Sequence, residues 1–588
     1  SSLEPMNDTK PPDAADDPMA SVTRPTRKAT PTLLRNVLIP DSGGDGYLRR
    51  DVLIADGLLA TIAPAGTLPT PHGGGQLVDC THRMLLPGFF NAHTHSVQHW
   101  VRGLIMPLPL ELWVLELIHH EPRGNGGWNG PKSFDKTPSL AIGVSAMLCG
   151  VEALLSGCTA ILDHLFIRNC EDMAAAVAAY KAVGIRAFIA PMLDDDAELY
   201  QNFIPLCSAA EEVNRRAHAA GCACGSRGMR ADGNFRERPG GSDAEKTKKQ
   251  LALWEECVER FHRPDEGIHV VIGPVTAYSA SLDMLRGAAD IRRRHGLAGH
   301  THLLETRAQA MMARQKFASG SAVTHLAESG FLSLPGTSCA HACWLTDDEA
   351  KLMAESGASV VHCPVSNLRL GSGVLPLSKF LEHGVNVAIG CDGSASSDGQ
   401  DMLEALKLAT IIHTASTPEY RSWPTARFTA LTLAARNGYR SVNFGGDAGG
   451  GELLEGRVAD VTLWDLTALS LLPRTDPLSL VVLGSRTQAP GAGSGLDAAW
   501  VDGVLTVEGG SPVGIDLLAL RALLIGLQPD YRAPKVTDPS LLPHTAAAEV
   551  EYRAALCLDT PDGADTVKPE LARYEQGRTL YDPTLPTA

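Results

Sequence analysis

The central part of the chain alternates short, mainly apolar runs with longer runs in which apolar residues recur every three or four positions. Runs of the first kind are typical of buried strands, and runs of the second kind are typical of helices packed on a sheet. The order strand, helix, strand is clearest in CTAILDHL (158–165), CEDMAAAVAAYKAVG (170–184) and IRAFIAPM (185–192). The same order returns in GIHVVIGPV (267–275), SLDMLRGAADIRRRHG (281–296) and LAGHTHLLET (297–306).

This alternation predicts an α/β protein whose parallel strands are joined by helices. Three further strand candidates, each preceded by a helical run, are TSCAHACWL (337–345), ASVVHCPVS (358–366) and NVAIGCDGS (386–394). So many successive units favour a closed (β/α)8 barrel over an open sheet, and no Gly-rich dinucleotide turn follows the first strand. The predicted barrel occupies residues 86–446, with a surface insertion at about 207–249 that is rich in Gly and charge.

Shorter strand-like runs with turn signals lie on both sides of this region. They are LLRNVLIP (33–40) and DVLIADGLLATIAP (51–64) before it, and GRVADVTLWDL (456–466) and AAWVDGVLTVEGG (498–510) after it. We expect residues 31–85 and 447–510 to pair into one small β-sandwich domain. Residues 1–30 show no periodicity and are expected to be unstructured, with the first five a remnant ahead of Met6. Residues 511–588 are expected to form a C-terminal extension that wraps the body.

Composition and net charge exclude several classes of protein. With 44% hydrophobic and 20% charged residues in 588, the chain has the balance of a globular protein with a large core. A net charge of -16 leaves no basic surface for nucleic acid. The apolar runs are interrupted by Gly, Pro or charge before the ~18 residues of a membrane span. Thirteen cysteines without repeated spacing or a secretory signal predict reduced thiols in the cytoplasm.

Polar residues that can bind a metal follow several of the predicted strands. His93 and His95 alternate along a strand and therefore project from one face, but such a pair also occurs by chance. Later strand ends add His302, His341 and Asp392. Each has an ordinary alternative, because a histidine can be a hydrogen-bonded core residue and Asp-Gly is a common turn. Their joint occurrence at strand ends, where barrel active sites are built, favours a metal centre.

Four longer motifs around these residues resemble the amidohydrolase superfamily. They are PGFFNAHTH (87–95), HLLET (302–306), VVHCPVSNLRLGSG (360–373) and GCDGSASSDGQDMLEAL (390–406). The resemblance covers residues 32–510 and is closest to the branch that holds guanine deaminase, adenosylhomocysteine deaminase-like enzymes and s-triazine hydrolases. It implies a metal-dependent hydrolase that acts on a small heterocyclic molecule, and we also expect a homodimer.

The resemblance also assigns roles to the strand-end residues. It implies that one divalent cation, Zn²⁺ in the first place and Fe²⁺ as the alternative, is held by four ligands, namely His93, His95, His302 and Asp392. Glu305 corresponds to the family's proton-shuttling acid, His341 to the histidine beside the attacking water, and Asp392 can accept that water's proton. Binuclear relatives carry a bridging lysine on the fourth strand. The run HVVIGPVTAYSAS (269–281) has none, which favours one metal.

Four residues are candidates for substrate contact, and each has a structural alternative. Gln98 resembles a substrate-pairing glutamine but could face solvent, and Arg102 could orient an acidic group or serve the fold. Trp113 could stack on a ring or pack in a helix, and His164 ends a strand toward the predicted active face. Adenosine-type relatives carry a histidine where this chain has Val275, which disfavours a nucleoside.

The leading function is hydrolytic deamination of an aminated nitrogen heterocycle of purine, pterin, pyrimidine or triazine type, with release of ammonia. Hydrolytic dechlorination or cyclic amide C–N hydrolysis by the same machinery is the alternative. An alternative of another class is a catalytically inactive barrel that serves as a scaffold, which would require the loss of a metal ligand. The presence of Glu305 favours a leaving group that needs a proton, as ammonia does and halide does not.

Overall fold

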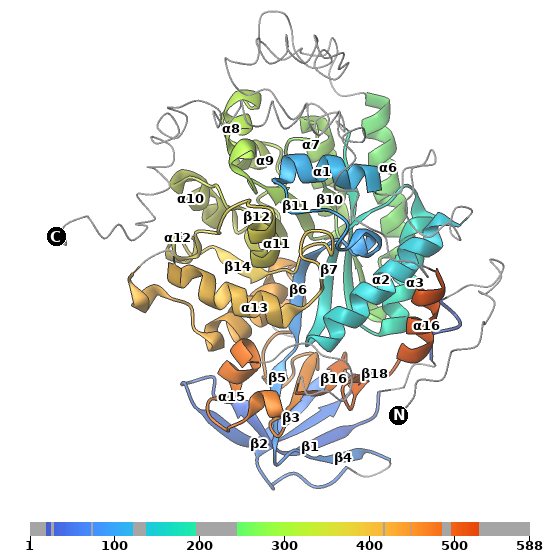
Figure 1. Cartoon of the computed structure of the whole chain (residues 1–588), viewed down its shortest axis with the longest axis vertical. Coiled ribbons are helices and arrows are strands. Elements are labelled where there is room, and N and C mark those ends of the chain that lie inside the picture. Colours follow the sequence, from blue (N-terminus) through green and yellow to red (C-terminus); the bar gives the residue numbers. More distant parts are fainter. Residues whose placement is uncertain are drawn as a thin grey trace, which may run out of the picture.

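The protein has a large body with outer helices and a small β-domain beneath it (Figure 1). The computed structural model describes residues 19–24, 29–71, 74–120, 137–195, 244–415, 418–446, 449–484 and 495–527.

The large body is built on two parallel sheets whose strands follow one another in chain order. The first sheet holds β6 (Phe89–Thr94), β7 (Cys158–Phe166), β8 (Arg186–Leu193), β9 (Ile268–Val270) and β10 (Gly273–Pro274). The second holds β11 (Gly299–Leu303), β12 (Thr337–His341), β13 (Ser359–His362) and β14 (Asn386–Ile389). Since β9 and β10 both pair with β8, they share one position, and the barrel has eight strand positions.

Contacts at both seams join the two sheets into a ring. Bridges from Ile272 to Gly299 and from Thr276 to His302 connect the β9–β10 segment to β11. On the other side, the backbone amide of Asp392, just beyond β14, donates to the carbonyl of His93 in β6 at 2.9 Å. The predicted (β/α)8 barrel is therefore confirmed. Because all strands run in parallel, their carboxyl ends meet at one rim.

Helices cover the outside of the barrel. They are α1 (Leu110–His120), α2 (Pro138–Leu155), α3 (Cys170–Val183), α6 (Ala244–Phe261), α7 (Leu282–His295), α8 (Arg307–Lys316), α9 (Ala322–Glu328), α10 (Asp347–Ser356), α11 (Pro364–Arg369), α12 (Leu377–Glu382), α13 (Met402–Ile411), and a π-helix at Phe428–Arg436 that continues into α14 (Asn437–Ser441). The side chains of Asn169, Ser281 and Thr346 cap α3, α7 and α10 by accepting from the backbone N–H three residues on. Each of these helices ends at a glycine in the left-handed conformation.

The small β-domain is one nine-stranded sheet that draws on both ends of the chain. Its strands are β1 (Thr32–Pro40), β2 (Tyr47–Ala55), β3 (Leu58–Pro64), β4 (Gln76–Asp79), β5 (Arg83–Pro87), β15 (Val461–Asp465), β16 (Leu496–Val501), β17 (Val504–Glu508) and β18 (Ser511–Pro512). β5 lies between β1 and β15, which places blue and orange strands side by side in Figure 1. The sheet extends slightly past both predicted boundaries, since β5 ends at Pro87 and β18 at Pro512.

Part of the segment expected to be unstructured is packed on the barrel. Met19 and Val22 are buried, and Met19 lies against Gly143 of α2. Thr23 forms a β-bridge with Ile515, and Arg24 pairs with Asp516 at 2.9 Å, just before α16 (Leu517–Leu527). The expectation for residues 1–30 was therefore wrong for 19–24. Two apolar side chains in a polar stretch give no periodic signal, although they suffice to anchor it.

The predicted insertion at about 207–249 needs one correction. Residues 207–243 lie outside the described part of the chain. From Ala244 onward the chain is helical, and α6 buries Trp254 and contacts α3 and α7. The final residues of the predicted insertion therefore belong to the outer helical layer. The many charged residues at the start of α6 gave that stretch the appearance of a surface loop.

The α2 helix is long and apolar enough to qualify as a membrane span, although the sequence analysis indicated none. Over 18 residues its mean hydropathy is 1.7, so by length and composition it could cross a membrane. Within the described residues it is the one such helix, and 67% of the window is buried inside the protein. Burial of this extent is typical of a core helix, and it accounts for the apolar composition without a bilayer.

Candidate metal centre and active site

Three histidines and one aspartate meet at the carboxyl rim of the barrel. His93 lies in β6 and His95 directly after it, His302 lies in β11, and Asp392 follows β14. The Nε2 atoms of His95 and His302 are 3.2 Å apart. Oδ1 of Asp392 lies 3.5 Å from Nε2 of both His93 and His95. The predicted ligands therefore come together from three strand ends.

Each of these histidines has its Nδ1 atom engaged on the side away from the centre. Nδ1 of His95 lies 2.7 Å from the carbonyl of His164, and Nδ1 of His302 lies 2.7 Å from the carbonyl of Val275. Since a carbonyl only accepts, both Nδ1 atoms carry the proton and both Nε2 atoms present lone pairs to the centre. Nδ1 of His93 lies 2.8 Å from Nε2 of His300, a second imidazole.

Burial favours the neutral form of the His93 and His302 imidazoles. It lowers the pKa of His93 well below its usual value, and it lowers the pKa of His302 to about 3. Burial acts in the opposite direction on Asp392, but the facing imidazoles, above all His93, hold the pKa of that carboxyl well below its usual range. Three neutral nitrogen donors and one carboxylate form a set that suits a divalent cation.

The donor spacing fits a single divalent ion. With bonds of about 2.0 to 2.1 Å, ligand atoms around zinc are separated by roughly 3.3 Å, close to the spacings above. His93 Nε2 is buried and has no hydrogen-bond partner, so it faces the centre unsatisfied. His93, His95 and His302 also form one of the groups whose ligand atoms all lie within 4.8 Å of one another. The chain therefore has a histidine-rich candidate metal site.

Glu305 and His341 face this centre from neighbouring strand ends. His341 Nε2 lies 3.5 Å from Oε2 of Glu305 and 3.9 Å from Oδ2 of Asp392. Burial raises the pKa of Glu305, so its carboxyl holds a proton more readily than a carboxyl in water. Asn367 in α11 contacts Nδ1 of His341 at 2.9 Å, and Ser372 donates to Oε1 of Glu305 at 2.8 Å.

The backbone is strained where these residues leave their strands. Leu304, His341 and Asp392 have φ angles of 44°, 72° and 64°, in the left-handed region that non-glycine residues rarely adopt. Such conformations persist where surrounding contacts impose them, and they are frequent at functional sites. At Asp392 the surrounding contacts include hydrogen bonds to its carbonyl from Thr94 at 2.9 Å and from Gln400 at 2.6 Å.

Gln98 lies beside the metal ligands. It belongs to a short 3-10 helix, Ser96–Val101, that follows His95, and its side chain is 5% exposed. Its Oε1 accepts from the backbone N–H of Ala395 at 3.2 Å, which fixes the orientation of the amide and directs its NH₂ group elsewhere. A Cβ at Gly393 would lie 1.9 Å from that Oε1, so only glycine leaves room for Gln98 next to Asp392.

The other three substrate candidates have partners that favour their structural alternatives. Arg102 forms a two-pronged ion pair with Glu152 of α2, at 2.9 and 2.5 Å. Trp113 is buried in an apolar cluster that includes Leu370 and Ala395. His164 is fully buried, contacts the carbonyl of Gly273 at 3.2 Å, and supplies the carbonyl that orients His95.

Several residues that hold the site in place were not singled out from the sequence. Asn367 and Ser372 orient His341 and Glu305, while Gln309 accepts from the backbone N–H of Glu305 at 2.7 Å. Asp163 accepts from both the backbone and the hydroxyl of Ser96. Asn367 and Ser372 lie inside the motif VVHCPVSNLRLGSG, so the motif itself was the signal, although it does not state their partners.

Glu111 is a second buried carboxyl near Glu305. It lies at the start of α1, accepts a hydrogen bond from Thr306 and is 4% exposed. Burial, reinforced by the charge of Glu305, raises its pKa to about 7. A carboxyl with a raised folded-state pKa contributes stability that is complete below its unfolded-state pKa and is lost as the pH rises through the folded value.

We therefore expect Glu111→Gln to flatten part of the pH dependence of stability. Across the window from the ordinary glutamate pKa of 4.5 to about 7, the wild type loses up to about 3 kcal/mol through this group, at about 1.4 kcal/mol per pKa unit. The amide loses nothing in that window. Urea unfolding of metal-free protein at pH 5 and pH 8 measures the difference between variant and wild type. A difference that does not change with pH would contradict this expectation.

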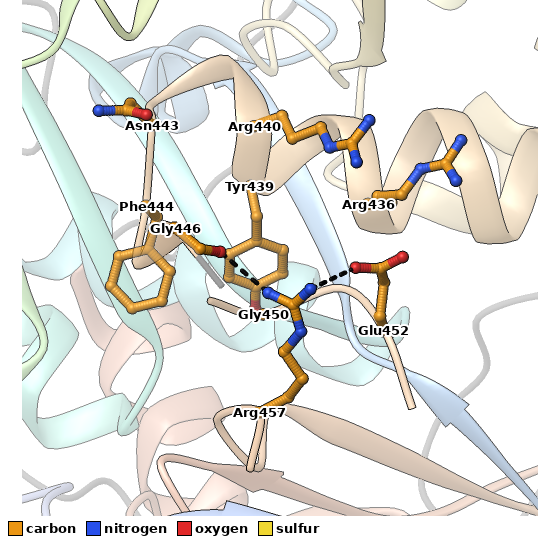
Figure 2. Close-up of a pocket in the computed structure, with 9 residues that line it drawn as sticks. All are labelled: Arg436, Tyr439, Arg440, Asn443, Phe444, Gly446, Gly450, Glu452 and Arg457. Atoms are coloured by element: carbon orange, nitrogen blue, oxygen red, sulfur yellow. Dashed lines mark hydrogen bonds and ion pairs between the residues drawn. The ribbon is translucent and has the colours of Figure 1, made fainter. Parts of the chain in front are cut away.

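A separate pocket lies at the opposite end of the barrel and does not serve this centre. It has a volume of about 230 Å³ and is lined by residues of α14 and the following loop, with Arg457 donating to Gly446 at 2.9 Å and pairing with Glu452 at 3.0 Å (Figure 2). A Cβ at Gly438 of α14 would touch Phe90, the second residue of β6, whereas His93 lies toward the other end of that strand.

Comparison with known proteins identifies the family of the chain. A model of the amidohydrolase family matches residues 84–501, and the chain belongs to that family. Among its curated relatives is 5-methylthioadenosine/S-adenosylhomocysteine deaminase 2 of Archaeoglobus fulgidus, 29% identical over 442 residues that cover 75% of this chain and 86% of the relative. Another is 8-oxoguanine deaminase of Pseudomonas aeruginosa, 28% identical over 487 residues that cover 80% and 92%.

Solved structures show the same fold. Atrazine chlorohydrolase from Arthrobacter aurescens TC1, complexed with zinc, matches 84% of this chain and all of its own chain (100%) with a TM-score of 0.67 at 20% identity. An adenosine deaminase from Xanthomonas campestris with bound zinc matches 85% and 99% with a TM-score of 0.66 at 22% identity. These likenesses confirm the predicted architecture of a barrel with a small β-domain.

Proposed function

We propose that the protein hydrolytically deaminates an aminated nitrogen heterocycle and releases ammonia. The observation that carries this proposal is the position of Glu305, a carboxyl whose pKa is raised by burial and whose Oε2 lies 3.5 Å from Nε2 of His341, which in turn lies 3.9 Å from Oδ2 of Asp392. Ammonia must be protonated as it leaves, and this carboxyl can supply that proton. The two curated relatives named above are deaminases, one of 5-methylthioadenosine/S-adenosylhomocysteine and one of 8-oxoguanine, which supports the same reaction.

In this proposal one divalent cation is held by the Nε2 atoms of His93, His95 and His302 and by the carboxylate of Asp392. Bound there, it makes water a usable nucleophile at neutral pH by lowering the pKa of that water. Zn²⁺ is the first choice for this donor set and Fe²⁺ the second. The fourth strand position, β9 and β10, offers no lysine to bridge a second ion, so we propose a single metal.

The side chains around the centre divide the proton transfers between them. Asp392 accepts the proton of the attacking water, because its low pKa keeps it ionised and able to act as an acceptor. Glu305 delivers its proton to a ring nitrogen, takes up the proton that Asp392 received from the water and passes it to the leaving amine. The hydroxyl proton released as the product carbonyl forms then restores the acid. His341, held through Nδ1 by Asn367, presents Nε2 to the charge that develops on the attacked carbon's substituents.

A dechlorination is the second candidate, because the structure of a chlorohydrolase has the same fold. Halide leaves without a proton, so that reaction does not require the acid that Glu305 provides. Cyclic amide hydrolysis would also use the centre. The inactive scaffold is disfavoured, since all four predicted ligands are present and oriented.

The proposal is tested by metal analysis of the purified protein together with an ammonia-release screen over guanine, 8-oxoguanine, pterins, cytosine and aminotriazines. We expect about one metal ion per chain and ammonia from at least one class of ring. Stoichiometric metal with no ammonia, but with chloride from a chlorotriazine, would support dechlorination instead. Protein that binds no metal would support the scaffold.

We also propose that the Gln98 amide contacts the substrate through its NH₂ group. Gln98→Glu keeps the acceptor for the Ala395 N–H but removes both donors. We expect kcat/KM to fall by about 10- to 100-fold, the size of a lost hydrogen bond to a buried polar group, with metal content unchanged. A variant that retains full kcat/KM would show that Gln98 serves only to position the loop after Asp392.

Finally, we propose a cytoplasmic location and a homodimeric state. The cysteines in the described part of the chain are buried and form no disulfides with one another, which suits a reducing compartment. The substrate is expected to be a small molecule, and the net charge of -16 disfavours nucleic acid as a partner. Light scattering of the purified protein measures the oligomeric state, and a mass of one chain would contradict the dimer.

A further inference from the structure

His300 lies one layer beneath the metal centre and touches one of its ligands. It belongs to β11, two positions before His302, so the two imidazoles project from the same face of the strand. Its Nε2 lies 2.8 Å from Nδ1 of His93, and its Nδ1 lies 2.7 Å from Oγ of Ser338. All three side chains are fully buried. Ser338 is the residue directly opposite His300 on β12.

The hydrogen bonds among Ser338, His300 and His93 form a row in which the donors all point the same way. When the Ser338 hydroxyl turns its hydrogen toward the carbonyl of Gly299, 3.5 Å away, its oxygen accepts the proton on Nδ1 of His300 at 2.7 Å. A neutral imidazole carries one proton, so Nε2 of His300 is left with a lone pair. It can only accept from Nδ1 of His93.

The direction decides whether His93 can be a ligand. With its proton on Nδ1, His93 turns a lone pair on Nε2 toward Asp392, His95 and His302. If the row ran the other way, Nε2 of His93 would carry the proton and could not bind a cation. His95 and His302 have backbone carbonyls as acceptors, which allow one direction only. His93 is the one ligand whose acceptor is a side chain that could itself adopt either tautomer.

We propose that His300 and Ser338 form a positioning pair that sets the tautomer and ring orientation of His93 and so raises the affinity of the centre for its metal. The proposal rests on the metal site of the proposed function. It adds a role for two residues that touch neither metal nor substrate. Partners of this kind typically change metal affinity by about 10- to 100-fold.

The test compares two substitutions of similar size at position 300. In His300→Gln, an amide oxygen takes the place of Nε2 and can accept from His93, whereas His300→Leu offers no acceptor. Competition with a chromogenic chelator gives the Kd of each protein for Zn²⁺. We expect His300→Leu to bind Zn²⁺ about 10- to 100-fold more weakly than wild type, and His300→Gln to stay within about threefold.

Ser338→Ala provides a second variant if His300→Leu fails to fold. Without the hydroxyl, Nδ1 of His300 loses its acceptor and the row loses its direction, so we expect weaker Zn²⁺ binding than in wild type. Ser359→Ala is the matched control, because Ser359 is a buried serine that pairs with Ser338 on the neighbouring strand β13 and does not contact His300. Its Zn²⁺ affinity should equal that of wild type.

Thermal unfolding of the metal-free proteins separates positioning from a purely structural role. If His300→Leu lowers the unfolding temperature but leaves the Kd for Zn²⁺ unchanged, the positioning role is wrong. Equal weakening by His300→Leu and His300→Gln would also overturn it, because the acceptor would then be irrelevant. Absence of Zn²⁺ binding by the wild type would overturn the proposed metal site itself, together with this role.

Discussion

Glu305→Gln is expected to reduce turnover by about three orders of magnitude or more while the protein keeps its metal. The acid is used twice in the proposed reaction, once at a ring nitrogen and once at the leaving amine, and a single positioned proton donor contributes about 10²- to 10⁴-fold. Glutamine has nearly the same shape and can still accept from Ser372, but it cannot release a proton. Steady-state rates and metal analysis of the same preparation measure both quantities.

The matched control for this substitution is Glu111→Gln. It also replaces a buried carboxyl by its amide, but Glu111 accepts its hydrogen bond from Thr306 and is not hydrogen-bonded to His341 or Asp392. We expect it to retain turnover within a few-fold. If both variants lose activity equally, the loss reflects the packing of this region. If Glu305→Gln keeps full deaminase activity, its assigned role as the acid is wrong.

The second large effect is expected for Asp392→Asn, which should impair both metal binding and chemistry. The amide removes the one negative charge among the four proposed ligands, and it also removes the group that accepts the water's proton. We expect weaker metal binding and, even at saturating metal, a residual loss of turnover of about 10²-fold or more. Titrating the variant with metal while following the rate separates the two losses.

Full recovery of turnover at high metal concentration would contradict the proton-accepting role and leave Asp392 as a ligand only. Circular dichroism of the variant shows whether the strained turn at this position survives. The turn is expected to persist, because its hydrogen bonds from Thr94 and Gln400 go to the backbone carbonyl and not to the side chain.

Short-range patterns predicted the barrel and placed the candidate ligands at strand ends, whereas the ligand set itself was implied by the resemblance to a family. Alternation of strand and helix indicates a parallel barrel, and a barrel brings strand ends to one rim whatever the loops do. His93 and His95 share a face through the two-residue period of a strand. His302 and Asp392 lie on or just after apolar runs. None of these predictions required knowledge of which distant side chains are in contact.

The remaining features depend on contacts between distant segments, and local patterns do not carry them. Arg102 was a candidate for substrate binding because no local pattern indicates its ion pair. Its partner, Glu152, lies fifty positions later in α2. Residues 19–24 were excluded because their anchoring partners lie near Ile515. The proposed role of His300 depends on how deep its side chain lies inside the barrel. The two-residue period of a strand predicts which face a side chain is on, but it does not predict that depth.

Because β5 lies between β1 and β15, the sheet of the small domain cannot be completed until the C-terminal strands have been synthesised. Leu85 of β5 pairs with Leu463 of β15, so one edge of the early strands stays open while the whole barrel is synthesised. Pairings between such distant residues form slowly, and open strand edges invite association with other chains. A ribosome-bound or prematurely ended chain that stops before Val461 should therefore be prone to aggregate, even with every proposed metal ligand already in place.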